Sequence, residues 1–417
     1  MQEGIIICLV SSYPPVRAGE STYAQSYVNA LLTYLNNEIE EIFVLSHVDG
    51  KKEQQDSSQD PDKVKVYRLF DSHNFLSKNL AFLKIFRKIR KIRPDVVHFQ
   101  YPPIPKSRFG GLLGEPLLPL FLLLKIIRVP FVVTLHSIWF PDEAEARAYE
   151  LTKNRLLSKF AKHYFKILMY FFGIIPDKLF ILVTNENTKI IQAFSHAYHI
   201  PPEKLRVELH GLSYFDKSTE DSNPKSKKIT CLGYIVPNKG YEFVLMAMKD
   251  VLKKIPDASL VIAGSTISGE GREYFNKLRR MVSEYSIEGS VTIEERYLSE
   301  TEFAEYVRNS AIVILPYLRV LGVSGIMSLA VSYKVPVIAS SSGPLFDEIS
   351  HIVPIVPPAN NYRLAEEIIK ILESDEYRKT IIKKYEVYLS THDWSVVTKE
   401  NYKEYINLIK LKSPIRN

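Results

Sequence analysis

Cysteine is nearly absent from this 417-residue chain, which has only Cys8 and Cys231, each inside an apolar run. This excludes a disulfide-stapled fold and a cysteine-ligated metal site, and it predicts two buried strand thiols in a reducing compartment. Glycine is scarce too, at 17 residues, which excludes a collagen-like chain. The most apolar window, LLPLFLLL at 117–124, is far shorter than the roughly 20 residues that a membrane-spanning helix needs.

Three sequence signals are also missing. No G-x-G-x-x-G follows a strand, which disfavours a dinucleotide-binding enzyme, and no G-x-x-x-x-G-K-[ST] is present, which disfavours P-loop chemistry. The opening MQEGIIICLVSSYPP has no basic region ahead of its apolar run, so we expect no targeting segment and a cytoplasmic protein.

What the chain does have is enough apolar material for large cores. Hydrophobic residues make up 46% and aromatic residues 12%, and the length predicts two to three domains. Lys and Arg number 54 against 47 Asp and Glu, which gives a net charge of +7. This mild excess is compatible with phosphate ligands, with an anionic lipid surface or, on charge alone, with nucleic acid.

Short apolar, β-branched runs alternate with helix-spaced segments along most of the chain. The runs that predict strands in the first half are Ile5–Val10, Ile42–Ser46, Val64–Tyr67, Val96–Gln100, Phe131–Leu135 and Leu179–Val183. Those of the second half are Lys228–Leu232, Ser259–Ala263, Val291–Ile293, Ile312–Leu315 and Val335–Ala339. Strands that alternate with helices predict parallel sheets covered by helices on both faces.

We therefore predict an α/β fold of two doubly wound, Rossmann-like domains. The first covers residues 1–212, a polar linker covers 213–228, and the second covers 229–394. The tail has helical periodicity, and we expect a C-terminal helix at about 395–417 to pack back on the first domain. Such sheets bind ligands at the carboxyl ends of their strands, so a shared site is expected in a cleft that the two domains face.

Several residues that follow predicted strands are candidates for a ligand site. In the first domain these are Gly19, which ends a long loop and opens a helix, and His136, which closes a strand. In the second domain, Lys239 precedes a helix N-terminus, where a lysine can meet a phosphate. The corresponding alternatives are a proline-rich turn with a Ser/Thr cap, an ordinary core histidine and a solvated loop lysine.

Three further segments of the second domain have the same character. Gly264 ends the run LVIAG and allows close approach of a ligand. The segment GVSGI at 322–326 opens a helix and can offer backbone N–H groups to a phosphate. A loop of small residues at 340–343 is followed by the acidic pair Asp347 and Glu348.

Taken in order, these features resemble the GT-B fold retaining glycosyltransferases of family GT4, the glycosyl transferases group 1. The matching pieces are YPP…AG…Y at 13–23, PDVVHFQ at 94–100, TLH at 134–136, LGY…NKG…A at 232–247, PDASLVIAGS at 256–265, ILPY…SG…A…VPVIAS at 314–340 and HDWS at 392–395. Each piece is weak by itself, but seven in the right order over almost the whole chain are specific.

The resemblance implies transfer of a hexose, mannose or glucose, from a GDP- or UDP-linked donor to a glycan or lipid-linked acceptor. The anomeric configuration would be retained, with no metal ion and no cofactor. His136 and Lys239 would be the catalytic residues, with Lys239 on the donor diphosphate. Gly19 and Glu20, the latter where a second glycine is common, would form the acceptor and phosphate loop. The implied donor-binding residues are Gly264, Ser265, Tyr317, Ser324, Gly325, Ile326 and Glu348.

The sequence departs from that family pattern at several positions. Tyr234 stands where many relatives have arginine, and Leu321 and Leu329 stand where relatives have a pair of glutamates. The pattern PY…SG at 316–325 instead matches a subgroup of the family. Arg319, close by in sequence, is a candidate for replacing the missing charge.

The basic run Lys84–Arg93 holds six cations, with apolar residues at helical spacing among them. It predicts either a contact with an anionic membrane surface or an ordinary surface helix whose apolar side covers the sheet. The Leu-rich segment 112–127 and the segment Tyr164–Ile175 are expected to be buried helices, which if exposed would suit a lipid-linked acceptor.

Two alternatives to an active transferase remain open. A non-catalytic GT-B module that binds a nucleotide or glycan, or supports a partner transferase, is favoured by the missing arginine and glutamates. A sugar phosphorylase is less compatible, because the sequence shows no pyridoxal-phosphate lysine context. Retention of both His136 and Lys239 favours the enzyme.

Overall fold

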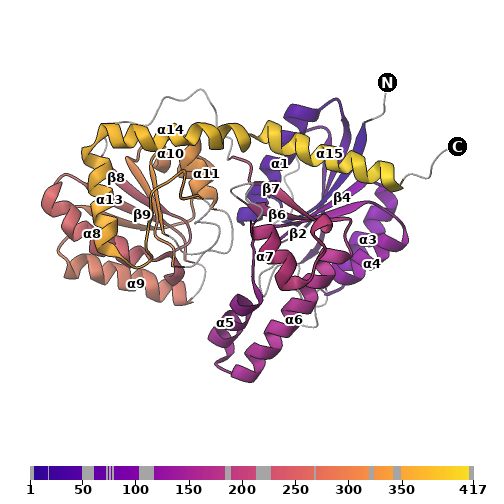
Figure 1. The fold of residues 1–417 in the computed structure, drawn as a ribbon, viewed down its shortest axis with the longest axis horizontal. Helices are drawn as coiled ribbons and strands as arrows, with labels where there is room; N and C mark the ends of the chain where they lie inside the picture. The colour runs from indigo at the N-terminus through magenta and orange to yellow at the C-terminus, as the bar shows by residue number, and fades with distance from the viewer. Residues whose placement is uncertain are drawn as a thin grey trace. The chain divides into compact units, whose positions relative to one another are not determined.

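A computed structural model describes residues 4–16, 18–48, 61–71, 74, 77, 79–102, 117–183, 189–212, 227–266, 269–318, 324–340 and 349–412. The chain divides into two compact units (Figure 1). Unit 1 comprises Met1–His210 together with Trp394–Asn417, and unit 2 comprises Gly211–Asp393.

Unit 1 is built on a parallel sheet whose described strands have the order β3-β2-β1-β4-β5-β6-β7. These strands are β1 (Ile5–Val10), β2 (Ile39–Val48), β3 (Val64–Asp71), β4 (Val96–Tyr101), β5 (Phe131–Leu135), β6 (Lys178–Val183) and β7 (Leu205–Leu209). Every residue of β4 and β5 is buried, as expected for central strands that have helices on both faces.

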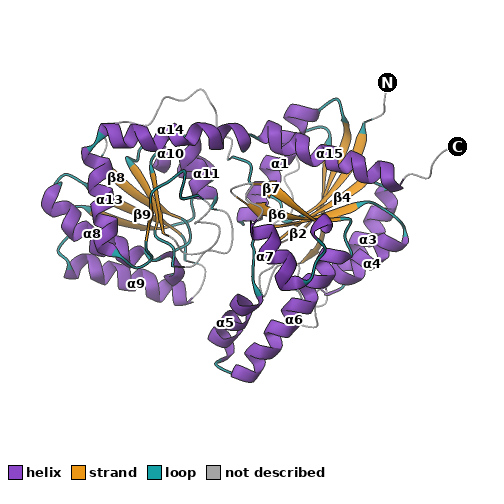
Figure 2. Ribbon diagram, viewed as in Figure 1, coloured by secondary structure: helices purple, strands orange, loops and turns teal. Residues whose placement is uncertain are grey.

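Helices cover both faces of this sheet (Figure 2). They are α1 (Gly19–Leu35), α3 (Ala81–Ile92), α4 (Leu117–Ile126), α5 (Pro141–Thr152), α6 (Arg155–Ile174), α7 (Lys189–Tyr198), the short η2 (Pro202–Lys204) and α15 (Trp394–Lys412). Although α15 ends the described chain, it packs on α1, and the hydroxyl oxygens of Tyr27 on α1 and Tyr405 on α15 lie 2.6 Å apart.

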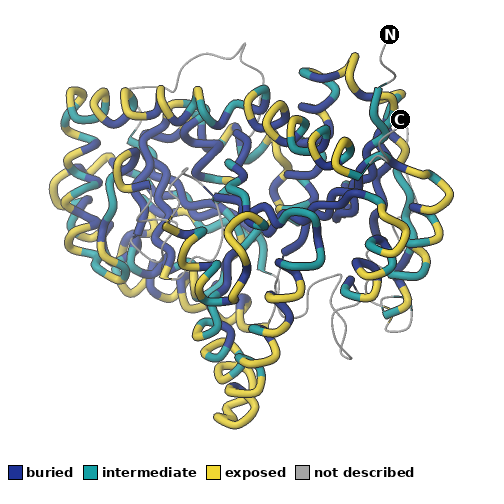
Figure 3. Tube along the Cα trace, turned by 45° about the vertical axis from the view of Figure 1, so that its right-hand side comes forward, coloured by how far each residue is buried: buried dark blue, intermediate teal, exposed yellow. Residues whose placement is uncertain are grey.

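Unit 2 repeats this architecture with a second parallel sheet. The order of its described strands is β10-β9-β8-β11-β12-β13. They are β8 (Lys228–Leu232), β9 (Ser259–Gly264), β10 (Val291–Glu295), β11 (Ile312–Leu315), β12 (Val337–Ser340) and β13 (Ile355–Val356). The apolar side chains of these strands form one core with the inner faces of the surrounding helices. Figure 3 shows the buried strands enclosed by helices whose outer faces are exposed.

The helices of unit 2 begin with clear local signals. They are η3 (Pro237–Lys239), α8 (Tyr241–Lys254), α9 (Gly269–Glu284), α10 (Glu300–Arg308), α11 (Gly325–Ser332), α13 (Asn361–Glu373) and α14 (Asp375–Thr391). Ser299 and Glu302 form a capping box at the start of α10, and Ser324 caps α11 through a hydrogen bond from the N–H of Met327.

The predicted fold class, two doubly wound α/β halves, is confirmed. Strands β1, β5, β8 and β11 begin and end at the predicted residues. Two edge strands were not predicted, β7 and the two-residue β13. Strand β12 begins at Val337 rather than Val335, since Pro336 has no N–H for the ladder. Cys8 and Cys231 are both buried, as predicted, and burial raises the pKa of both thiols.

The three apolar or basic helical segments differ in how they are buried. Helix α3 turns Ile85 and Ile89 to the protein and leaves most of its cations exposed, so its apolar side covers the sheet. The segment Tyr164–Ile175 was expected to be buried, which is wrong for one of its faces, because Tyr164 and Ile167 are exposed. Helix α4 is likewise only half-buried, and 112–116 lies outside the described residues.

No helix in the described part of the chain is both long enough and apolar enough to cross a membrane.

Candidate functional site

Each sheet has one point at which the strand order reverses. In unit 1 this point lies between β1 and β4, and in unit 2 between β8 and β11. Open α/β sheets bind ligands there, because the loops leaving the carboxyl ends of the two flanking strands diverge. The loops that leave β1, β8 and β11 lead to Gly19, Lys239 and Ser324, which are three of the residues that the sequence singled out.

His136 directly follows β5, and its backbone N–H donates to the carbonyl of Tyr101 at 3.0 Å. Its Nε2 lies against Oε1 of Gln100, so the ring donates through Nε2 and keeps Nδ1 as an acceptor. The rings of His136 and Tyr23 meet edge to face, with centroids 4.9 Å apart. Burial, and then the charge of His210, lowers the pKa of His136 to about 3, so its imidazole is neutral.

A buried polar network lies behind Gln100. His98 Nε2 lies 2.7 Å from the hydroxyl of Thr134, which in turn donates to Glu208 at 2.5 Å. Nδ1 of His98 contacts the hydroxyl of Tyr405 on α15. Burial lowers the pKa of His98 to about 3. His98 is therefore neutral.

The network ends at a buried carboxyl group on β7. Asn401 of α15 donates to Glu208 at 2.8 Å. Burial raises the pKa of Glu208, while hydrogen bonds from Thr134 and Asn401 and the charge of Arg206 act in the opposite direction. The C-terminal helix thus supplies two of the groups that fix the strands carrying His136.

The sequence analysis assigned no role to this network, although a signal was present. In a strand, residues two apart share a face, so His98 and Gln100 share one, as do Thr134 and His136 of the neighbouring strand. Polar pairs of this kind at the carboxyl ends of two buried strands are unusual for core positions.

The first loop brings Glu20 close to the strand it leaves. The hydroxyl of Ser12 lies 3.4 Å from Oε1 of Glu20, in the first turn of α1. Gly19 begins the helix in an exposed position, and a Cβ there would meet nothing within 4 Å. The carboxylate of Glu20 already lies at the positive end of the α1 dipole, whereas the first turn of α11 has no acidic residue. A bound anion is therefore stabilised less at the start of α1 than at the start of α11.

Lys239 is half-buried at the end of η3, between β8 and α8. Its Nζ lies 3.6 Å from the centre of the Tyr317 ring, which is buried in the loop after β11. This cation–π contact holds the Lys239 side chain beside the start of α8. The structure therefore brings together Lys239 and Tyr317, two of the predicted residues.

The loops after β8 and β11 are also joined through their backbones. The N–H of Leu318 donates to the carbonyl of Asn238 at 2.9 Å. Gly240 has φ +65°, and a Cβ on it would lie 2.2 Å from the carbonyl oxygen of Pro316. Glycine is required here for both reasons.

Gly264 and Ser265 follow β9 and contact the loop after β8. A Cβ on Gly264 would lie 1.8 Å from the carbonyl oxygen of Gly233, so this glycine is needed for backbone packing whatever binds nearby. The carbonyl of Ser265 accepts a hydrogen bond from the N–H of Ile235 at 3.0 Å. Both residues therefore help to fix the chain that leads to Lys239.

The backbone at the start of α11 has the geometry of an uncovered helix N-terminus. Ser324 is the N-cap, Gly325 is exposed with nothing within 4 Å of a Cβ, and Ile326 packs against the core. The first N–H groups of this helix point away from its own hydrogen-bond ladder, as at any helix N-terminus. Among the described donor-side residues, this is the best place for an anion.

Some predicted positions cannot be placed. Glu348, Arg319 and Leu321 lie outside the described residues. Leu329, at the second glutamate position, is buried in the core of unit 2. Its side chain therefore stabilises the unit and does not face a ligand.

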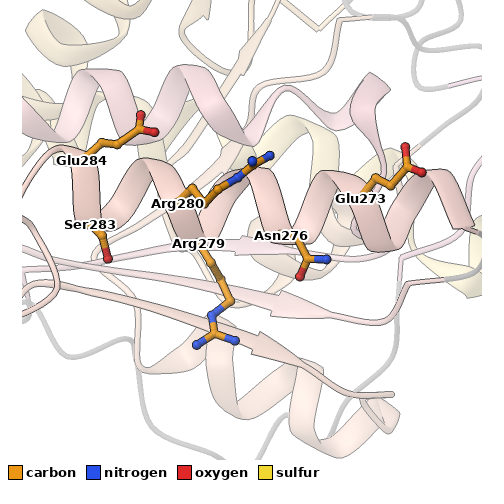
Figure 4. Close-up of a pocket in the computed structure, with 6 residues that line it drawn as sticks. All are labelled: Glu273, Asn276, Arg279, Arg280, Ser283 and Glu284. Atoms are coloured by element: carbon orange, nitrogen blue, oxygen red, sulfur yellow. The ribbon is translucent and has the colours of Figure 1, made fainter.

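Within the described ranges, no three His, Cys, Asp or Glu side chains gather closely enough to hold a metal ion. A shallow depression on unit 2 is lined by one helix alone (Figure 4), through Glu273, Asn276, Arg279, Arg280, Ser283 and Glu284 of α9. Because no strand end contributes to it and its charges are mixed, we assign it no ligand.

Comparison with known proteins gives one family match and several more distant relatives. Residues 215–386 match the family model described as glycosyl transferases group 1. The phosphatidyl-myo-inositol mannosyltransferase of Mycobacterium tuberculosis is 25% identical over 201 residues, which are 46% of this chain and 50% of that protein. The chain thus spans about half the length of the curated relatives it matches.

Solved structures match over nearly the whole chain. Sucrose-phosphate synthase from Thermosynechococcus elongatus aligns with a TM-score of 0.71 at 16% identity, covering 98% of this chain and 100% of the other. The Anabaena protein Alr3699/HepE, in complex with UDP and glucose, aligns with a TM-score of 0.67 at 14% identity, covering 97% and 100%. At such identities these matches show the fold alone. The chain therefore has the GT-B fold, and its residues 215–386 match the family model of the glycosyl transferases group 1.

Proposed function

We propose that this protein is a retaining glycosyltransferase that moves a hexose, mannose or glucose, from a nucleotide-sugar donor to a glycan or lipid-linked acceptor. Unit 2 holds the donor and unit 1 the acceptor. The reaction needs no metal ion. The family match of residues 215–386 supports the transferase class, and the geometry at the β8–β11 reversal supports the donor site.

The observation that carries this proposal is the joined pair of loops after β8 and β11. They place the Lys239 cation and the N-terminus of α11 at the carboxyl ends of neighbouring parallel strands. When the bond between sugar and diphosphate breaks, negative charge grows on the phosphate oxygens of the leaving group. A fixed cation and oriented N–H groups stabilise that charge in the transition state without Mg²⁺.

His136 acts on the sugar. Its ring is neutral and is held by Gln100, so Nδ1 can accept a hydrogen bond from a sugar hydroxyl. Alternatively, its backbone carbonyl meets the positive charge that builds at the anomeric carbon. The buried network of His98, Thr134 and Glu208 keeps the supporting strand in register.

The candidates for the donor and acceptor come from the relatives. The curated relative is named a phosphatidyl-myo-inositol mannosyltransferase, and the Anabaena structure holds UDP and glucose. These names support mannose, and glucose carried by UDP, as candidates for the transferred sugar. A lipid-linked acceptor places the reaction at the cytoplasmic face of a membrane.

A non-catalytic GT-B module is the second candidate, and the burial of Leu329 favours it. The family pattern that the sequence resembles has a glutamate there, whereas this leucine belongs to the core. Such a module binds a nucleotide or glycan and turns nothing over. Turnover therefore separates the two candidates.

The test is a panel of UDP-, GDP- and ADP-sugars added to the purified protein, with binding followed by calorimetry and hydrolysis by nucleotide release. We expect one nucleotide class to bind and its sugar to be released or transferred. Lys239→Ala should weaken binding and turnover. Lys370→Ala is the matched control, because Lys370 also lies 3.6 Å from a tyrosine ring, that of Tyr377, away from these loops. Absence of binding across the panel refutes the proposal, and binding without turnover favours the non-catalytic module.

A further inference from the structure

Helix α6 has two apolar faces, and only one of them is covered. Phe165, Leu168 and Phe172 lie on the buried face, toward the sheet of unit 1. On the other face, apolar side chains recur at residues 156, 157, 160, 164, 167 and 171, which is the spacing of one continuous stripe on a helix. The hairpin of α5 and α6 extends from the sheet of unit 1 (Figure 1).

The apolar side chains of this stripe are unusually exposed for a helix that packs on a sheet. The exposed fractions are 77% for Leu156, 51% for Leu157, 69% for Phe160, 43% for Tyr164, 58% for Ile167 and 39% for Phe171. Single exposed apolar residues are normal on protein surfaces, but a contiguous row of six marks an interaction surface. Figure 3 shows the exposed outer side of this hairpin.

The charges along α6 have one sign. Its sequence, RLLSKFAKHYFKILMYFFGI, contains no Asp or Glu. Arg155, Lys159 and Lys166 run beside the apolar stripe at helical spacing. Lys162 lies on the far side of these cations from the stripe and pairs with Asp142 and Glu145 of α5. The acidic side of α5 is thereby turned away from the exposed face of α6.

These features indicate what kind of partner the exposed face of α6 binds. An apolar stripe that includes aromatic rings, flanked by cations and free of acids, is the pattern of a helix that lies in the plane of an anionic bilayer. A second copy of this chain is disfavoured, because a two-fold contact between such faces sets cations beside cations. We propose that the exposed face of α6 binds the surface of an anionic phospholipid membrane.

This surface differs from the basic run on α3. There, Ile85 and Ile89 are buried, so α3 presents cations without an apolar anchor. Electrostatic attraction alone is screened by salt, whereas apolar insertion is not. Helix α6 supplies both and is therefore the principal contact.

The proposal stands on α6 alone and does not depend on the transferase reaction. Membrane binding is measured without donor or acceptor, so its failure leaves the proposed activity untouched. Equally, a protein that binds no nucleotide sugar can still bind vesicles.

The experiment is co-sedimentation of the full chain with vesicles of equal parts phosphatidylglycerol and phosphatidylcholine, against vesicles of phosphatidylcholine alone. Wild type should sediment with the anionic vesicles, and much less with the neutral ones. The double variant Phe160→Ser with Ile167→Ser should lower the partition coefficient at least about tenfold. Arg155→Gln with Lys159→Gln should lower it by about tenfold at low salt.

Two matched controls separate α6 from general surface properties. Arg87→Gln with Arg90→Gln removes the same charge from α3, and Leu122→Ser with Ile126→Ser removes exposed apolar side chains from α4. Both should stay within about threefold of wild type. The residues changed in the two α6 variants and in the two controls all lie on the surface. The thermal unfolding of each variant should therefore match that of wild type, so that a loss of vesicle binding cannot be due to a loss of folding.

A direct readout of insertion comes from Phe160→Trp. We expect its fluorescence to shift to the blue when anionic vesicles are added, because position 160 enters an apolar environment. The proposal is overturned if wild type does not bind anionic vesicles, if the α3 control loses as much binding as the α6 variants, or if the Phe160→Ser and Ile167→Ser pair abolishes a dimer instead.

Discussion

Gly240→Ala is the substitution whose effect can be worked out most fully from the structure. Gly240 joins η3 to α8 with φ +65°, a left-handed conformation. Alanine in that region costs about 1 kcal/mol relative to glycine. Its Cβ would also lie 2.2 Å from the carbonyl oxygen of Pro316, which is backbone and has no rotamer to change. Moving that loop aside costs a further 1–3 kcal/mol or so, as in other overpacked sites.

The sum is a destabilisation of unit 2 by about 2–4 kcal/mol. For a unit of this size that lowers the melting temperature by roughly 4–16 °C. The shift of the Pro316 loop also moves Tyr317 from beneath Lys239, so affinity for the nucleotide should fall with stability. Differential scanning calorimetry and nucleotide titration measure the two effects.

Gly269→Ala is the matched control. Gly269 begins α9, and a Cβ there would meet nothing within 4 Å. Alanine should leave stability unchanged or raise it slightly, since it favours the helix. If Gly240→Ala melts within 1 °C or so of wild type, or no lower than Gly269→Ala, the close approach of the two loops is wrong.

The remaining predictions concern the charges and rings of the site. Lys239→Ala should lower the transfer rate on the order of 10²–10³-fold while the melting temperature stays near that of wild type, and a rate within threefold would refute its role. His136→Ala should lose turnover with little change in nucleotide affinity; retained turnover with a large fall in melting temperature would make His136 structural. His98, whose pKa is about 3 when folded against 6.5 ordinarily, makes unfolding easier as the pH falls below about 6.5, because the unfolded chain binds the proton more tightly. At pH 5 this amounts to about 2 kcal/mol, and His98→Gln should flatten the dependence of stability on pH between 6.5 and 4.

The parts of the fold that depend on local pattern could be predicted from the sequence. Buried parallel strands such as Phe131–Leu135 and Ile312–Leu315 are continuous apolar runs, so their limits are visible. Two of the described edge strands are not: Leu205–Leu209 contains Arg and Glu, and Ile355–Val356 is only two residues long. Their pairing depends on the neighbouring strand rather than on their own composition.

The candidate site was only partly predictable for the same reason. His136 directly follows an apolar strand, and Lys239 lies in the loop between an apolar strand and a helix, so both stand out as polar residues in loops that leave the sheets. Their surroundings depend on contacts between distant segments, as between Glu208 and Asn401, which are 193 residues apart. The second face of α6 was missed because its sequence is apolar on both sides, and composition does not reveal which side the sheet covers.

The central claim is that the joined loops of unit 2 hold the diphosphate of a nucleotide-sugar donor without a metal ion. Calorimetric titration of the full chain with UDP and with GDP, in the presence of EDTA, tests it most directly. The account predicts saturable binding of one of these nucleotides, weakened at least tenfold or so by Lys239→Ala and unchanged by Lys370→Ala. Binding of neither nucleotide, or equal loss of binding in both variants, would contradict it.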